Sequence, residues 1–123
     1  YICDPATGIQ EIDFALGATN IDMSTAVWVK VKAISGGSTQ TLIVPNIADA
    51  DSPAGRRLII SDMNDLDQAS AVQITIASGG GAVAGLIDGS TSEEIFDHAS
   101  LSIVCTGERV GGAADAGLIW KII

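Results

Sequence analysis

The chain of 123 residues has few aromatic, sulfur-containing and histidine side chains. Its two cysteines are too few for a disulfide framework or a four-cysteine zinc site. No apolar run approaches the roughly 20 residues that a membrane-spanning helix needs. Apolar residues make up 47% of the chain and charged residues 17%, a balance too hydrophobic for intrinsic disorder. We therefore expect one folded domain over residues 1–123.

Basic residues are scarce as well. Fifteen Asp and Glu residues against six Lys and Arg residues give a formal net charge of -9. The basic residues are scattered: only Arg56 and Arg57 are adjacent, and only Lys30 and Lys32 share a face of a predicted strand. A chain of this charge repels phosphate backbones and anionic membranes at long range. We expect neither nucleic acid nor a membrane as a direct partner.

Apolar residues recur with period two along most of the chain, which is typical of strands with one covered face. The clearest case is residues 26–33, where valines alternate with Trp28, Lys30 and Lys32. Glycine-rich turn signals separate such runs. The pattern predicts an all-β fold, a compact β-sandwich or barrel-like domain of about eight short strands. The other predicted strands are residues 12–16, 40–44, 57–61, 72–76, 101–105 and 118–123, and of these 40–44, 57–61, 101–105 and 118–123 are apolar enough to be covered on both faces.

Four segments have residues that chemistry could use, and none has the required spacing. His98 is the only histidine and has no nucleophile in a recognisable setting, so it reads as a loop residue. Residues 62–67 have a calcium-like composition but fail the EF-hand spacing, and the glycines at 79–81 lack the helix of a phosphate-binding loop. Glu93 and Glu94 could in principle serve glycosidase chemistry, but two adjacent acids usually point apart and no aromatic platform for a sugar is evident. We expect no enzyme activity, no cofactor and no metal site.

The cysteines leave two alternatives open. Cys105 ends an alternating apolar run, where an unpaired cysteine is commonly a small buried apolar residue. A disulfide bond between Cys3 and Cys105 is the other possibility, and the sequence does not decide between them.

From residue 53 onward the chain contains an ordered series of short motifs. They are a Pro-x-Gly-Arg entry at 53–56, apolar strands at 58–62 and 101–107, Ile-Thr-Ile at 74–76, a glycine turn at 79–80, Ile-Asp-Gly at 87–89, and a terminal Trp with apolar residues at 120–123. This series resembles β-rich modules of tailed-phage fibre, spike and head-decoration proteins. The chain departs from the family pattern at Lys121, where a second aromatic residue is common, and in the insertion-like segment 108–117.

The resemblance implies a virion structural protein. Residues 1–50 would supply N-terminal strands that can dock on the capsid, and residues 53–123 would form the phage-like module. Residues 1–50 show no heptad repeat of a fibre shaft, which favours a capsid decoration or cement protein that binds the major capsid protein as a homotrimer at the capsid surface. The alternative is a receptor- or carbohydrate-binding module of a tail fibre. A glycan-degrading enzyme is a more distant one.

The C-terminal strand predicts where copies of the chain meet. Leu118, Trp120 and Ile122 occupy one face of residues 118–123, and Ile119 and Ile123 occupy the other. One face can rest on the chain's own core, but the second needs cover from another copy. Trp28, on the polar face of its strand, is the further candidate for a partner contact, although its own chain could equally cover it. The predicted interface is therefore Trp28, Leu118, Ile119, Trp120, Ile122 and Ile123.

Overall fold

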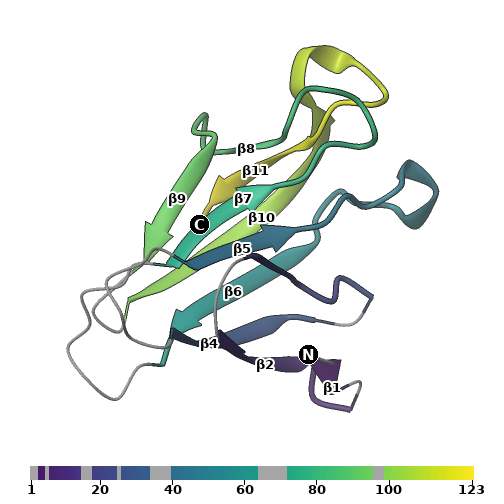
Figure 1. Ribbon diagram of the computed structural model, residues 1–123. Helices are drawn as coiled ribbons and strands as arrows, with labels where there is room; N and C mark the ends of the chain where they lie inside the picture. Colours follow the sequence, from purple (N-terminus) through teal and green to yellow (C-terminus); the bar gives the residue numbers. More distant parts are fainter. Residues whose placement is uncertain are drawn as a thin grey trace.

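The computed structural model describes residues 3–4, 6–14, 18–24, 26–33, 40–63, 72–95 and 99–123. These residues form eleven strands and two 3-10 turns (Figure 1). None of the helical turns in this part of the chain is long and apolar enough to cross a membrane. The strands are β1 (Cys3–Asp4), β2 (Ile9–Phe14), β3 (Ala18–Asn20), β4 (Trp28–Ala33), β5 (Gln40–Val44), β6 (Arg57–Asp62), β7 (Val72–Ile76), β8 (Leu86–Ile87), β9 (Ser92–Ile95), β10 (Ser100–Arg109) and β11 (Leu118–Ile122), and the turns are η1 (Asp49–Asp51) and η2 (Val110–Gly112).

The strands form two sheets, which confirms the predicted all-β sandwich. Sheet A has seven strands in the order β1-β2-β4-β6-β10-β11-β8, and sheet B has four in the order β3-β5-β7-β9. There are more strands than the predicted eight. β1, β3 and β8 are only two or three residues long, and β9 is a polar edge strand, so their sequences do not have the apolar pattern by which strands were predicted. Residues 108–109 extend β10, so part of the segment that looked like an insertion belongs to the sheet.

The chain passes from one sheet to the other with every strand from β2 to β7. In sheet A, β2, β4 and β6 are therefore parallel neighbours, and in sheet B, β3, β5 and β7 are parallel neighbours. We call this two-sided winding of β2–β7 the coil. Beyond it, β10 pairs with β6 and β11, and β9 with β7, all in the antiparallel sense.

The registers place apolar positions side by side on the inner face of each sheet. In sheet A, Val29 lies opposite Ile60, which lies opposite Leu101. In sheet B, Leu42 lies opposite Ile74. Inner residues of both sheets belong to one buried cluster, and each large apolar side chain that is fully buried contributes about 1.5–3 kcal/mol. The largest fully buried side chains are Trp120, Ile12, Ile21, Leu42, Leu58, Ile60, Ile74, Ile76, Ile87, Ile103 and Leu118.

Arg109 fastens the loops at one end of the sandwich, and its side chain is only 7% exposed. Its Nη1 donates to Asn46 Oδ1 (2.8 Å) and the Ala116 carbonyl (2.6 Å), and its Nη2 donates to the Ile47 carbonyl (2.9 Å). Nε and Nη2 both donate to Asp49 Oδ1, at 3.2 and 3.1 Å. We call this set the Arg109 clamp, and it joins the segment after β5 to the segment before β11.

Two glycines near the clamp are required by close backbone contact. A Cβ atom on Gly117 would lie 2.0 Å from the backbone nitrogen of Gly85, and a Cβ on Gly85 would lie 2.3 Å from the Leu118 carbonyl oxygen. Gly117 N also donates to the Val83 carbonyl at 2.9 Å. The two segments can cross at this distance only because neither residue has a side chain.

Candidate interaction face

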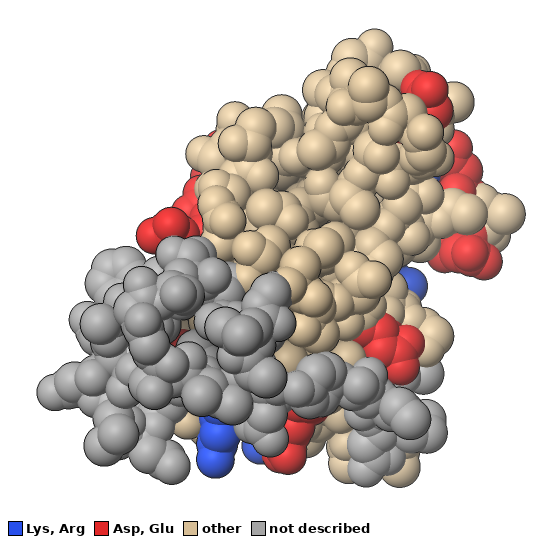
Figure 2. Space-filling view, viewed as in Figure 1, with Lys and Arg blue, Asp and Glu red and all other residues tan. Residues whose placement is uncertain are grey.

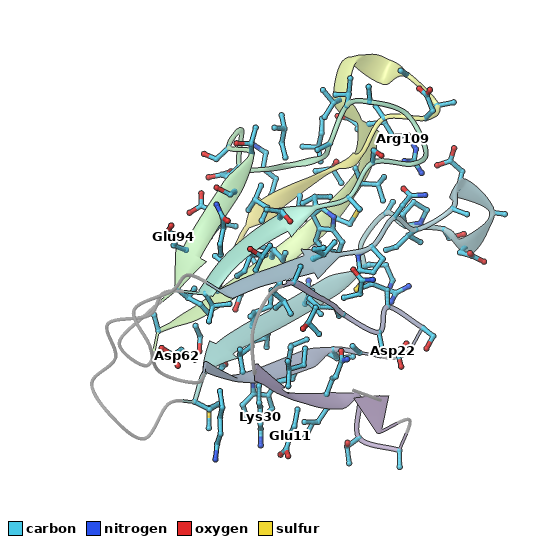
Figure 3. All side chains as sticks on the ribbon, viewed as in Figure 1. Glu11, Asp22, Lys30, Asp62, Glu94 and Arg109 are labelled. Carbon is cyan, nitrogen blue, oxygen red and sulfur yellow. The ribbon has the colours of Figure 1, made fainter. Side chains whose placement is uncertain are left out.

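Sheet A has an outer face, directed away from the core, on which apolar and basic residues gather. On β4, Val29 and Val31 are fully buried, so the alternating residues Trp28, Lys30 and Lys32 point outward. On β6 and β11 the same alternation places outward the residues Arg57, Ile59, Ile119 and Lys121. In Figure 3, Lys30 on β4 and Glu11 on β2 extend side by side away from the sheet.

The strand registers arrange these residues in rows across the sheet. Ile9 lies opposite Trp28, and Trp28 opposite Ile59. Ile59 lies opposite Ser102, whose carbonyl accepts a hydrogen bond from Ile123 N at 2.9 Å. The row from Ile9 to Ile123 thus crosses β2, β4, β6 and β10, ends at the residue that follows β11, and is apolar except at Ser102. Ile59 is 39% exposed and Ile123 62% exposed.

Trp28 is held in place within this row. Its Nε1 donates to Ser61 Oγ at 2.9 Å, and the Ser61 and Ser100 hydroxyls are 2.8 Å apart. The ammonium of Lys30 lies 4.6 Å from the centre of the indole ring, within the range of a cation–π interaction. The Trp28 side chain is half-buried: part of it is covered by neighbouring residues of the same chain, and part is exposed to solvent. An indole fixed in this way has little side-chain entropy left to lose.

Four of the six basic residues of the chain lie on this outer face. The remaining two have structural contacts: Arg109 forms the clamp, and Arg56 donates to the Met23 carbonyl. Arg57 and Lys121 both lie opposite Val104, one on each side of it. Lys121 also approaches Asp88 at 3.4 Å. The four basic residues on the face are Lys30, Lys32, Arg57 and Lys121.

A shallow hollow of about 190 Å³ lies at one end of the face, lined by Glu11, Ile12, Lys30, Lys32 and Met63.

The basic residues are scattered along the sequence, but most of them are not scattered over the surface of the folded chain. The fold collects most of them on one surface of an acidic protein, because β4, β6 and β11 belong to one sheet.

The predicted interface residues divide into two groups. Trp28, Ile119 and Ile123 point outward from sheet A, and Trp28 and Ile123 share one row. Leu118 and Trp120 instead point inward and are 1% and 0% exposed, so they stabilise the protomer's own core. Ile122 lies opposite Ile103 at the end of the strand and is 42% exposed. That copies of the chain meet at these residues stays a prediction.

Sequence reasoning missed Arg57 and Ile59. Residues 57–61 were expected to be covered on both faces, since three consecutive apolar residues follow Arg57. In the structure Leu58 and Ile60 are fully buried while Arg57 and Ile59 are exposed. The available signal was Arg57 itself, because its charge marks the outward register of the strand.

The other chemical candidates do not come together. His98 and residues 64–67 lie outside the described residues, and Asp62 is buried. The amides of Gly79 and Gly81 donate to the Asp115 carbonyl at 3.1 and 2.9 Å, so they do not point at a phosphate site. Within the described ranges no three His, Cys, Asp or Glu residues are grouped as metal ligands.

Glu93 and Glu94 lie opposite Ile74 and Gln73, on different faces of sheet B, as their adjacency predicted. Cys105 is a free, buried cysteine, which confirms its interpretation as a small apolar residue. β1, which contains Cys3, is separated from β10 by three strands, or roughly 19 Å at the usual strand spacing. A disulfide bond needs Cα atoms within about 7 Å, so this fold does not bring the two cysteines together.

No family model, curated protein or solved structure matches the chain. The likeness to tailed-phage modules consequently depends on the short motifs of residues 53–123 alone.

Proposed function

We propose that the protein is a virion structural protein of a tailed-phage-like particle, which associates with copies of itself through the outer face of sheet A and decorates the capsid surface as a homotrimer. The observation that supports self-association is that face, with its apolar row and ordered Trp28 on an otherwise acidic chain. The phage setting, the trimer and the major capsid protein as partner come from the family resemblance.

The size of the face indicates how strong such an association is. The face extends across the strands from β2 to β11 and along them from the level of Arg57 to that of Lys32, which is roughly 20 by 20 Å, or about 400 Å². A standard protein interface removes about 800 Å² from solvent on each partner. The face supplies about half of that area, so one contact of this kind is weak and its occupancy depends on concentration.

Weak contacts suit a protein that works on a lattice. A protein that binds only the assembled shell stabilises the shell by linkage, because each bound copy favours the assembled state. Three linked copies also bind more tightly than one, since the second and third contacts are intramolecular. A variant that cannot form the oligomer therefore loses shell binding even when its shell contacts are intact.

The tail-fibre alternative would use Trp28 as a platform for a sugar ring. The Lys30 ammonium already occupies one approach to that indole, and the indole N–H is bonded to Ser61. These contacts favour a role in protein association over sugar stacking.

A pair of matched substitutions tests the proposed face. Ile59 on β6 and Ile43 on β5 both point outward, one from sheet A and one from sheet B. We expect Ile59→Glu to weaken self-association at least about tenfold in sedimentation equilibrium, because it places a charge in the apolar row. Ile43→Glu should associate like the wild type. Equal behaviour of the two variants, with both folded by circular dichroism, would remove the assignment of the face.

Cosedimentation tests the decoration role separately. Empty expanded shells of the phage or prophage that encodes the chain should carry the wild type and Ile43→Glu into the pellet, and much less Ile59→Glu. A wild-type protein that stays in the supernatant with shells contradicts the decoration role. Binding to host cells or to a glycan array instead would support the tail-fibre alternative.

A further inference from the structure

The turn between β8 and β9 is a two-residue hairpin loop made of Asp88 and Gly89. The flanking residues bond each other in both directions, Ile87 N to the Ser90 carbonyl at 2.8 Å and Ser90 N to the Ile87 carbonyl at 2.9 Å. Asp88 and Gly89 both have positive φ, 51° and 86°. Positive φ at both central residues defines a type I′ turn, for which Asp-Gly is a preferred sequence.

The two central residues of this turn are open to solvent. Asp88 and Gly89 are both exposed. Figure 1 shows the turn projecting at the upper left of the molecule, and the same margin lies open in the space-filling view of Figure 2. Among the described residues, none accepts a hydrogen bond from the Gly89 amide. Water therefore reaches the Asp88 carboxyl group, and the amide beside it is free to react.

Asp88 is also the one aspartate of the chain that precedes a glycine. The side-chain carbon Cγ of an aspartate and the backbone nitrogen of the next residue can close a five-membered ring. Any residue other than glycine crowds this nitrogen with its Cβ atom and restricts its rotation. In the turn, a Cβ on Gly89 would meet nothing within 4 Å, so no neighbouring segment obstructs the approach.

We propose that Asp88 is a site of spontaneous modification, where the Asp88–Gly89 link rearranges to isoaspartate with water as the co-reactant. The Gly89 nitrogen attacks Cγ of the protonated Asp88 side chain. The N–Cγ bond forms, the Cγ–OH bond breaks, and the hydroxyl group leaves with the amide proton as water.

Water then opens the ring at one of its two carbonyl carbons. Opening at Cγ breaks the N–Cγ bond and restores aspartate. Opening at the main-chain carbonyl carbon breaks the bond of that carbon to Gly89 N, so the backbone now runs through Cβ and Cγ. One water is lost and one is regained, nothing is oxidised, and the mass of the chain is unchanged.

Isoaspartate at this position loosens a margin that both sheets share. The turn joins β8, at the edge of sheet A, to β9, at the edge of sheet B. An additional backbone atom in a two-residue loop is incompatible with both Ile87–Ser90 hydrogen bonds. The carboxylate also moves to Cα and leaves its position 3.4 Å from the Lys121 ammonium. The change accumulates with the age of the molecule and is independent of the proposed function.

Ageing the purified full chain at physiological temperature and mildly acidic pH tests the site. Endoproteinase Asp-N cuts before aspartate but not before isoaspartate. Cleavage before residue 88 should be lost at least about tenfold faster than cleavage before Asp51 or Asp115, which are also exposed but precede serine and alanine. The matched variant Asp88→Glu would have to close a six-membered ring. An isoaspartyl methyltransferase should label the aged wild type and leave aged Asp88→Glu at background.

Hydrogen exchange measures the structural consequence. The amides of Ile87 and Ser90 should exchange at least about tenfold faster in the aged wild type than in the fresh protein, and aged Asp88→Glu should keep its fresh rates. Cleavage before residue 88 that persists as long as cleavage before Asp51 and Asp115 would overturn the inference. Isoaspartate that forms only in chain unfolded by urea would overturn it as well. Unchanged exchange at Ile87 and Ser90 in the modified protein would contradict the loosening of the margin.

Discussion

The coil and the β10–β11 hairpin show the same alternation of apolar residues in sequence, yet their strands find partners in different ways. In the coil, Gln40 pairs with Val72, 32 positions later, because the chain visits the other sheet in between. In the hairpin, Arg109 pairs with Leu118, nine positions later. Alternation therefore reports which side of a strand is covered and leaves the partner strand open.

The two regions also differ in how their ends are fastened. The hairpin end has the Arg109 clamp, in which one nearly buried guanidinium bonds two loops. The first turn of the coil depends on Gln10, which is fully buried and whose Oε1 accepts the amide of Asp22 at 2.9 Å. We infer that the hairpin end is the more strongly fixed of the two, and three substitutions test this difference.

Arg109→Ala should have the largest effect. It leaves the Ile47 and Ala116 carbonyls without the donors they have in the clamp, and we expect the free energy of unfolding to fall by about 2–4 kcal/mol. Urea denaturation measures this loss. The control Arg57→Ala removes an exposed arginine and should change stability by less than about 0.5 kcal/mol. Similar losses in the two variants would show that the clamp does not stabilise the fold.

Gln10→Leu should have a smaller effect at the open turn of the coil. The substitution keeps an apolar body of similar size but leaves the Asp22 amide without the Gln10 acceptor, at a cost of about 1–3 kcal/mol. The matched control is Gln73→Leu, whose side chain is half-buried and bonds the Ser92 hydroxyl at 3.2 Å. We expect a loss below about 0.5 kcal/mol there. A larger loss of unfolding free energy in Gln10→Leu than in Arg109→Ala would show that the coil end, and not the hairpin end, is the more strongly fixed.

Cys105→Val should have the smallest effect on the free energy of unfolding, and this effect should appear only at alkaline pH. Burial raises the pKa of the Cys105 thiol above its ordinary value of 9.0. The folded state therefore favours the neutral thiol, so its stabilisation is complete below the unfolded pKa and is lost as the pH rises through the folded pKa. Between pH 8 and 10 the wild type should lose up to about 1 kcal/mol more than Cys105→Val, measured by urea denaturation at each pH. Equal losses of stability in the wild type and in Cys105→Val would mean that ionisation of the Cys105 thiol gives no measure of how β10 packs.

Much of the fold could be predicted from particular residues. The alternation in residues 26–33 located β4 and its outward side, and the runs at 40–44 and 72–76 match β5 and β7. β9 was missed because Ser92, Glu93 and Glu94 have no apolar alternation, and only an edge position accommodates so polar a strand. The parallel pairing was missed because it depends on contacts between segments far apart in the chain.

The candidate face could be predicted only in part, for the same reason. Trp28 was recognised because a large aromatic residue stood on a polar side of its strand. Lys121 and Arg57 could not be joined to it, since nothing in the sequence states that β4, β6 and β11 share one sheet. Leu118 and Trp120 were assigned to the interface because both sides of residues 118–123 are largely apolar. The sequence of this segment does not show which side packs on the protomer's own core.

The alternation of the coil between two sheets has a consequence for synthesis on the ribosome. As the chain emerges from its N-terminal side, β2 cannot pair with β4 until β3 has been made and laid on the opposite sheet. The same delay recurs for β3, which waits for β5, and for β4, which waits for β6. Each nascent edge therefore remains open while roughly 20 to 30 further residues are translated, a period of seconds at ordinary elongation rates. The acidic charge of the chain, repelling neighbouring nascent chains on the same message, is well suited to protecting those edges from premature pairing.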